Sequence, residues 1–167
     1  MREFTDIIEV TDETVHLTDS VESLTLTFKQ REKSRLKVSL LSGESVGLFL
    51  PRGSVLKQGD LLTNDAGDVL EVCAAEESVS TIYTDDMHLL LRIAYHLGNR
   101  HVPLQVESTW LRYAHDHVLD DMVRLLGGHV TVEQAPLQPE SGAYGGGHQH
   151  GHDHESSHSH NHHVAAV

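Results

Sequence analysis

Histidines gather at the end of this chain of 167 residues, which contains 15 of them, eight within the last twenty positions. The run HQHGHDHESSHSHNHH alternates imidazole with small, polar or acidic residues, unlike the uninterrupted run of a purification tag. Neutral imidazole suits nickel, copper, zinc and cobalt better than calcium or magnesium. The predicted ligands of transition-metal ions in this tail are His148, His150, His152, His154, His158, His160, His162 and His163.

Three of the seven histidines before the tail are further candidate metal ligands, and they lie among helical and strand patterns. His96 falls in the last turn of a predicted helix, where the partial negative charge of the helix end favours a cation. Two copies of His96 that face each other across a two-fold axis would supply two rigidly held nitrogen ligands. His115 and His117 flank Asp116 where a second helix begins. Residues two apart on a helix point to nearly opposite sides, so these two share an ion only if His115 precedes the first turn.

The composition restricts the functional class. Only 12 Lys and Arg stand against 25 Asp and Glu, and the formal net charge of −13 argues against a nucleic-acid surface. The polar start MREFTDIIEV and the absence of a long apolar run predict a cytoplasmic protein without a membrane span. With Cys73 as the only cysteine, a disulfide within the chain and a Cys-x-x-Cys zinc site are excluded. We expect Cys73 to be a small buried hydrophobic residue.

Residues 1–75 have the pattern of a small all-β domain. Segments such as ESLTLTF and RLKVSLL alternate apolar and polar residues and are separated by short turn sequences. Alternation would place a run of basic residues on one strand face, namely Lys29, Arg31, Lys33, Arg35 and Lys37. Arg31, Lys33 and Arg35 are the predicted contacts for an acidic partner. A solvated edge strand kept soluble by charge explains the same run.

Residues 76–136 have the order strand, helix, strand, strand, helix, strand, which predicts a ferredoxin-like domain and an α+β protein overall. For the first helix we expect Thr84 as N-cap and Gly98 as the residue that follows the end. The second helix should end at Gly127 or Gly128. The residues expected to face inward are Met87, Leu90, Leu91, Ala94 and Leu97 on the first helix, and Val118, Leu119, Met122, Leu125 and Leu126 on the second. Residues 137–167 are predicted to form a disordered linker and tail.

The segment HDHVLDD is the one part of the sequence that suggests a metal-dependent enzyme. It resembles the His-x-His-x-Asp-His array of two-metal hydrolases, but Asp120 comes one residue late and Asp121 has no histidine after it. The chain contains neither a nucleophile elbow nor a phosphate-binding glycine loop. We therefore predict a protein that is not an enzyme. A histidine-rich nickel or zinc storage protein, which would need only the tail, stays open as an alternative.

Two segments and the histidine-rich end resemble one known family. YHLGNRHVPLQV (residues 95–106) and LRYAHDHVLDDMVRLLG (residues 111–127) look like the urease accessory protein family UreE, and Gly-Asn-Arg-His is the most specific part. The first domain is similar more loosely, through its β pattern and basic stretch. The resemblance implies a homodimeric nickel metallochaperone that supplies Ni(II) for the urease active site, together with an accessory GTPase and the urease apoprotein assembly complex.

The resemblance also implies roles for single residues. The family's central metal ligand falls on His96, and its paired histidines around an aspartate fall on His115 and His117. His101 matches the motif as a possible accessory ligand. Some relatives have another histidine before the His-Asp-His triplet, where this chain has Ala114. Imidazole ligands would also accept Zn(II), Cu(II) or Co(II). Copper(II) binds nitrogen ligands more strongly than nickel does, so the ligands alone do not select nickel. The family's first domain is similar to a peptide-binding domain of heat-shock chaperones, which implies partner contact.

Overall fold

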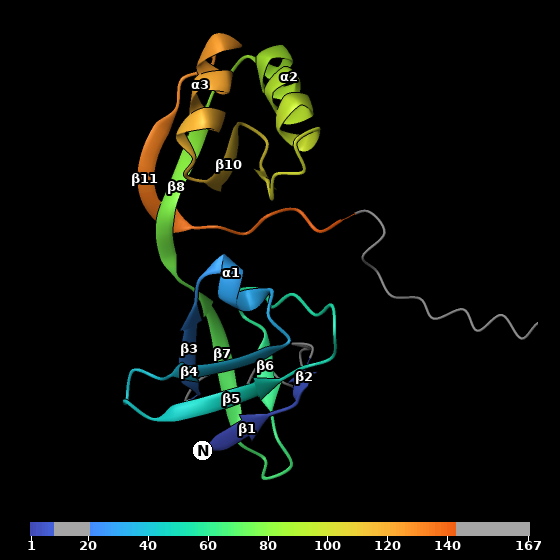
Figure 1. The fold of residues 1–167 in the computed structure, drawn as a ribbon, viewed down its shortest axis with the longest axis vertical. Coiled ribbons are helices and arrows are strands. Elements are labelled where there is room, and N and C mark those ends of the chain that lie inside the picture. Colours follow the sequence, from blue (N-terminus) through green and yellow to red (C-terminus); the bar gives the residue numbers. More distant parts are fainter. Residues whose placement is uncertain (9–20, 143–167) are drawn as a thin grey trace, which may run out of the picture.

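The computed structural model of the chain describes residues 1–8 and 21–142. Figure 1 shows two groups of elements, connected by the long strand β8 (Glu76–Tyr83). The histidine-rich tail lies outside the described residues, which end at Gly142. The disorder predicted from residue 137 onward is wrong for residues 137–142, because Leu137 is fully buried and the Glu140 N–H donates to the Leu104 carbonyl at 2.8 Å. Within the described ranges, no helix combines the length and the apolar character needed to cross a membrane.

The first group is built from two small sheets with a shared core. One sheet has the strand order β1-β5-β4 and the other has the order β2-β6-β7-β3. The strands are β1 (Arg2–Phe4), β2 (Asp6–Ile8), β3 (Glu22–Leu26), β4 (Arg35–Ser39), β5 (Ser45–Phe49), β6 (Leu61–Thr63) and β7 (Val69–Ala74). Two of the pairings are parallel, β1 with β5 and β3 with β7.

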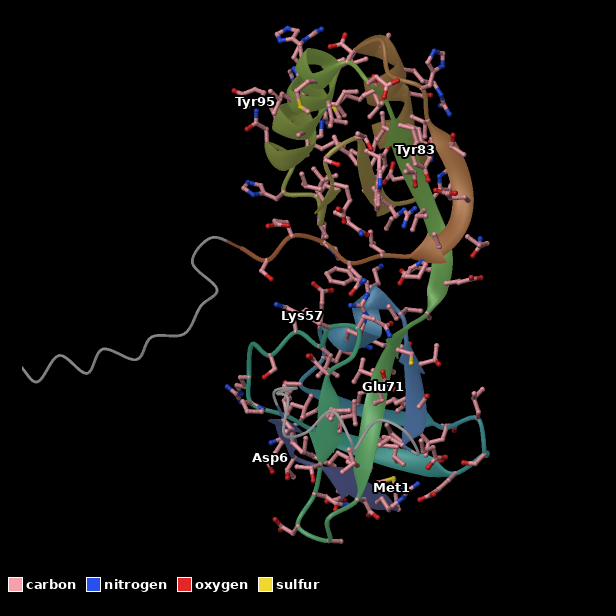
Figure 2. The ribbon with its side chains drawn as sticks, turned by 180° about the vertical axis from the view of Figure 1, so that it is seen from behind. Met1, Asp6, Lys57, Glu71, Tyr83 and Tyr95 are labelled. Atoms are coloured by element: carbon pink, nitrogen blue, oxygen red, sulfur yellow. The ribbon has the colours of Figure 1, made fainter. Side chains whose placement is uncertain are left out.

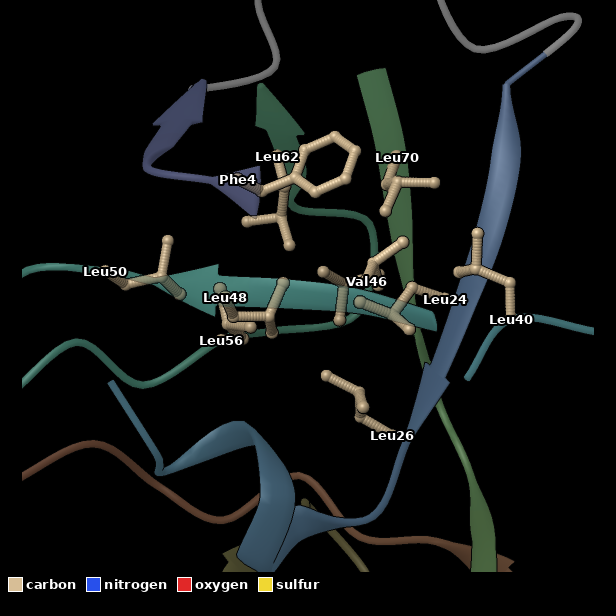
Figure 3. Close-up of a cluster of buried hydrophobic side chains, with 11 residues drawn as sticks. Phe4, Leu24, Leu26, Leu40, Val46, Leu48, Leu50, Leu56, Leu62 and Leu70 are labelled. Atoms are coloured by element: carbon tan, nitrogen blue, oxygen red, sulfur yellow. The ribbon is translucent and has the colours of Figure 1, made fainter. Parts of the chain in front are cut away.

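The core of this group consists of side chains that alternate along the strands. Phe4, Leu24, Leu48, Leu62 and Leu70 are fully buried and belong to one cluster, which Figure 3 shows between the two sheets. Period-two alternation directs one face of each strand inward. The strands confirm the β character that the sequence pattern predicted for this group.

A single turn of helix, α1 (Phe28–Arg31), interrupts the strands. Thr27 begins it through a capping box, in which the Gln30 side chain accepts a hydrogen bond from the Thr27 backbone N–H at 2.9 Å. The expected continuous strand across the basic run is therefore wrong. Cys73 is also less enclosed than expected, because it is half-buried on β7 with a free thiol.

The second group has the predicted ferredoxin-like plan. Its sheet has the strand order β11-β8-β10-β9, and all three pairings are antiparallel. The elements after β8 are α2 (Met87–Gly98), β9 (Gln105–Val106), β10 (Trp110–Ala114), α3 (His117–Leu125) and β11 (Thr131–Pro136). Both helices pack on a core that includes Ile82, Leu111 and Tyr113. The α+β fold prediction is confirmed.

The ends and the buried side of α2 differ from the prediction. Asp86, not Thr84, is the N-cap, and its carboxylate accepts a hydrogen bond from the Leu89 N–H at 3.0 Å. Gly98 is the last helical residue, with Asn99 as C-cap. The buried side chains of the helix are Leu90, Ile93 and Leu97. Met87 and Leu91 are exposed, because the sequence of α2 is apolar on two sides and only one side contacts the sheet.

On α3 the inward side is also shifted. Val118 and Leu125 are exposed, whereas Val123 and Asp120 are buried. The expected Leu119, Met122 and Leu126 do pack against the core. Gly127 follows the helix with a φ of 97°, a left-handed conformation that suits glycine, so one of the two predicted ends is confirmed.

The two groups of elements meet around the buried side chain of Arg31. Its guanidinium donates hydrogen bonds to the carbonyl oxygens of Leu56, in the first group, and Leu137, which follows β11. The Phe28 N–H also donates to the Glu77 carboxylate at 2.7 Å. Figure 1 shows the segment after β11 passing between the two groups.

Candidate metal centre

His96 lies in the last turn of α2, as the sequence predicts. Its side chain is half-buried, and its ring contacts the ring of Tyr95 edge to face, with 5.4 Å between the centroids. The carbonyl end of a helix favours a nearby cation. The position therefore suits an imidazole that holds a metal ion, although a single imidazole is one ligand only.

Beside His96, α2 presents an apolar surface to solvent. Met87, Leu91 and Tyr95 are 54%, 62% and 66% exposed and lie four residues apart, so they form one row along the helix. We call this row the outer stripe. Figure 2 shows Tyr95 on the outer side of α2. Contiguous exposed apolar side chains mark surfaces that bind another protein, and the ring contact of Tyr95 places His96 next to this one.

His115 lies immediately before α3 and is tied to the sheet. Its backbone N–H donates to the Ser78 carbonyl at 3.0 Å, which extends the β10–β8 pairing by one residue. Asp116 is the N-cap of α3, and its carboxylate accepts from the N–H groups of Val118 and Leu119. His117 is the first helical residue and is exposed. The requirement that His115 precede the first turn is therefore met.

The ring of His115 belongs to a polar network that the sequence did not reveal. Its Nδ1 lies 3.0 Å from the Ser80 hydroxyl and 3.3 Å from Oδ2 of Asp120. The Asp120 side chain is almost fully buried, and its Oδ1 accepts a hydrogen bond from the Tyr113 hydroxyl at 2.8 Å. Burial and the neighbouring Asp120 carboxylate raise the pKa of the Tyr113 phenol above its usual range. The network therefore holds a buried carboxylate, a neutral phenol and an imidazole together.

His101 lies apart from both positions. It has a φ of 55° in the turn after α2, and its N–H donates to the Gly98 carbonyl at 2.9 Å. The residue lines a hollow of about 510 Å³ between the two groups of elements, together with Pro103 and Glu140. In residues 1–8 and 21–142, no three His, Cys, Asp or Glu side chains converge in a way that could hold a metal ion.

Of the basic residues predicted to contact a partner, one is buried and two are exposed. Arg31 is 2% exposed and belongs to α1, so the expectation of one strand face is wrong for it and for Lys29. Lys33 and Arg35 are exposed, but Lys33 precedes β4 and only Arg35 lies on the strand, so the expectation is wrong for Lys33 as well. The expectation fails because the helical turn α1 interrupts the alternation of side chains that a continuous strand would have.

Both parts of the chain match profiles of one known protein family. The family profile of the UreE urease accessory protein N-terminal domain matches residues 4–75, and that of the C-terminal domain matches residues 77–163. The chain belongs to the UreE family. It is 56% identical over 149 residues to the urease accessory protein UreE of Proteus mirabilis, covering 87% of this chain and 92% of the relative.

Other UreE relatives show similar agreement. The urease accessory protein UreE of Vibrio parahaemolyticus is 64% identical over 121 residues, which cover 72% of this chain and 76% of the relative. That of Aliivibrio fischeri strain MJ11 is 61% identical over 124 residues, which cover 74% of this chain and 76% of the relative. Membership of this family assigns the chain to urease maturation, and its relatives are accessory proteins.

Ser80, Tyr113 and Asp120 are the members of the site that sequence reasoning missed. All three have polar groups and lie in segments whose apolar spacing indicates only which side faces the core. Asp120 and Asp121 are adjacent, and the apolar pattern of the helix does not indicate which of the two carboxylates is buried. The available signal was the position of Asp120 four residues after Asp116, because a helical turn brings it below the residues that precede the helix.

Proposed function

We propose that this UreE protein is a homodimeric nickel metallochaperone that binds Ni(II) and delivers it for assembly of the urease active site. The observation that carries the proposal is the placement of His96 in the last turn of α2, next to the outer stripe. Two-fold pairing of α2 through this stripe would bring two copies of His96 together. The pair would then supply a second ligand, which residues 1–8 and 21–142 of one chain do not place beside His96.

The tail and the His96 pair have different tasks in this proposal. Tail imidazoles capture Ni(II) and raise its effective concentration near the His96 pair, which holds the ion until a partner offers a better ligand set. Release is possible because imidazole ligands protonate near neutrality, which lowers their affinity for metal. The same ligands accept Zn(II), Cu(II) or Co(II). The metal that is delivered therefore depends on which ions are available and on the partner protein, as well as on affinity.

Two further proposals concern the organisation and the partners. Residues 1–75 and 76–136 fold as separate domains, and residues 137–167 connect to and form the histidine-rich tail. The separate hydrophobic clusters of the two groups support this division. The accessory GTPase of urease maturation, and the urease apoprotein assembly complex, are the proposed partners in the cytoplasm.

An exposed basic edge supports a docking position for an acidic partner segment. Arg35 and Lys37 are exposed on β4, which is the end strand of its sheet. Lys33 and Arg52 line an open hollow of about 490 Å³ next to it. In a chain with a net charge of −13, such a local excess of positive charge favours contact with acidic groups.

The test is a calorimetric Ni(II) titration of the full chain beside a form truncated after Ala143, with each oligomeric mass measured in parallel. The truncated form should bind fewer ions per dimer and keep the tightest site. His96→Ala should remove that site and abolish nickel transfer to the accessory GTPase, whereas His88→Ala, on an exposed position of the same helix, should not. An unchanged transfer rate in His96→Ala would refute the relay. Loss of all binding on truncation would instead favour the storage protein.

A further inference from the structure

We propose that Asp120 is a positioning residue for His115, which holds the ring proton on Nδ1 and thereby presents Nε2 as the metal-binding atom. The inference rests on the proposed function, because it takes His115 as a ligand of the transported ion. Beyond that function, the proposal assigns the tautomer of His115 and the ring atom that binds the metal. It also gives Asp120 an indirect part in metal binding.

The Asp120 carboxylate is buried, and a buried carboxylate needs hydrogen-bond donors around it. The residue is 1% exposed, in the first turn of α3. Oδ1 accepts the hydrogen bond from the Tyr113 hydroxyl at 2.8 Å. Oδ2 lies 3.3 Å from Nδ1 of His115 and 3.9 Å from a guanidinium nitrogen of Arg124. A buried carboxylate is costly without positive or donor groups around it. A proton on Nδ1 would place positive charge next to Oδ2 and so stabilise the carboxylate, while the hydrogen bond of Nδ1 is the one with the Ser80 hydroxyl.

The same contacts determine the tautomer of the His115 ring. An ionised carboxylate only accepts hydrogen bonds, so a lone pair on Nδ1 would face a negative oxygen at 3.3 Å. The Ser80 hydroxyl, 3.0 Å from Nδ1, adapts to either tautomer because it both donates and accepts. The proton therefore lies on Nδ1, and the lone pair of the neutral ring lies on Nε2.

The opposite edge of the ring is free for a metal ion. The His115 side chain is 39% exposed, and in the described part of the chain Nε2 has no hydrogen-bond partner. Histidine ligands of metal ions commonly donate their other ring N–H to a carboxylate, which orients the ring and makes the ligand nitrogen more basic. The backbone bond of His115 to Ser78 fixes the position from which the ring extends. A metal at Nε2 thus meets a ligand that is already oriented.

The neighbouring acid provides a matched control. Asp121 has a side chain 68% exposed and binds the Arg124 guanidinium at 2.9 Å on the helix surface. It has the same charge and the same helix as Asp120. Asp121→Asn therefore removes a charge near His115 without changing the contact to its ring.

The experiment is nuclear magnetic resonance of the nitrogen-15-labelled full chain, with the His115 ring signals assigned by their loss in His115→Ala. In the metal-free wild type, long-range proton–nitrogen correlations should show a protonated Nδ1 on the neutral ring. In Asp120→Asn, the side-chain amide would direct its NH₂ toward Nδ1 while its oxygen keeps the Tyr113 hydroxyl. The proton should then move to Nε2. Asp121→Asn should leave the wild-type tautomer unchanged.

Titration with Zn(II) alone then tests the ligand atom. The nitrogen shift of Nε2, not that of Nδ1, should change, and Asp120→Asn should weaken this binding by about 10–100-fold. If Zn(II) leaves the His115 ring unaffected in the wild type, the ligand role of His115 in the proposed function fails. The tautomer measured without metal still decides the role of Asp120 in that case.

Two outcomes would overturn the inference. One is an Nε2-protonated ring in the wild type, which needs no variant and therefore no assumption about folding. The other is a tautomer that changes in Ser80→Ala but not in Asp120→Asn, because the hydroxyl would then be the controlling group. The expected result in Ser80→Ala is an unchanged Nδ1–H ring.

Discussion

The two rigid histidine positions of the second domain are built in opposite ways. His96 lies at the end of α2, where its neighbour is the apolar ring of Tyr95 and the adjoining surface is exposed. His115 lies before the start of α3, where Ser80 and Asp120 surround Nδ1. In the described part of the chain no second ligand lies beside His96, and in the proposed function a second copy supplies it, whereas the ring of His115 is oriented by contacts within the chain. If the proposed function holds, the first arrangement helps a carrier to release its ion, because a site shared by two copies lasts no longer than their pairing.

The largest predicted effect follows from a charge on the outer stripe. Leu91→Glu would bring two carboxylates into the proposed interface, one from each copy. Because burial of a leucine contributes about 1.5–3 kcal/mol and the change occurs twice, dimerisation should weaken by at least about 100-fold. Sedimentation of the protein at several concentrations measures this. Leu125→Glu, on an 89% exposed position of α3, is the control and should leave the mass unchanged.

A larger side chain at Gly128, where α2 and α3 meet, should lower the stability of the fold. A Cβ on Gly128 would lie 2.7 Å from Cγ1 of Val123 and 2.8 Å from Cδ1 of Ile93, which belong to α3 and α2. Overpacking of this kind costs about 1–3 kcal/mol, so Gly128→Ala should lower the free energy of unfolding by that amount. Denaturant unfolding measures it. Gly98→Ala, where nothing lies within 4 Å, should have little effect, and equal losses would contradict the packing argument.

The smallest predicted effect distinguishes the two N-caps. Asp116 accepts two backbone hydrogen bonds at the start of α3, and Asp86 accepts one at the start of α2. Loss of a cap costs about 0.5–2 kcal/mol, and Asp116→Ala should be nearer the upper end than Asp86→Ala. Thermal unfolding of the metal-free proteins compares them. A larger loss in Asp86→Ala would mean that α3 depends less on its cap than the geometry indicates.

Sequence patterns predicted the elements better than the surfaces. The order of strands, helices and turns follows from periodicity, so the ferredoxin-like order of the second group and the β character of the first were predictable. Which side of α2 is buried was not, because Leu90 and Leu91 give the helix two apolar sides. The basic run was misread because the turn at Phe28–Arg31 depends on a capping box rather than on period. The burial of Asp120 depends on the Tyr113 hydroxyl, a contact made by the tertiary fold.

The number of tightly bound Ni(II) ions per chain, measured on the form truncated after Ala143, tests the shared His96 site most directly. Native mass spectrometry should give one ion per two chains in a dimer, and none of this tight binding in His96→Ala. One tight ion on each monomer, or a dimer that keeps its ion without His96, would contradict the account.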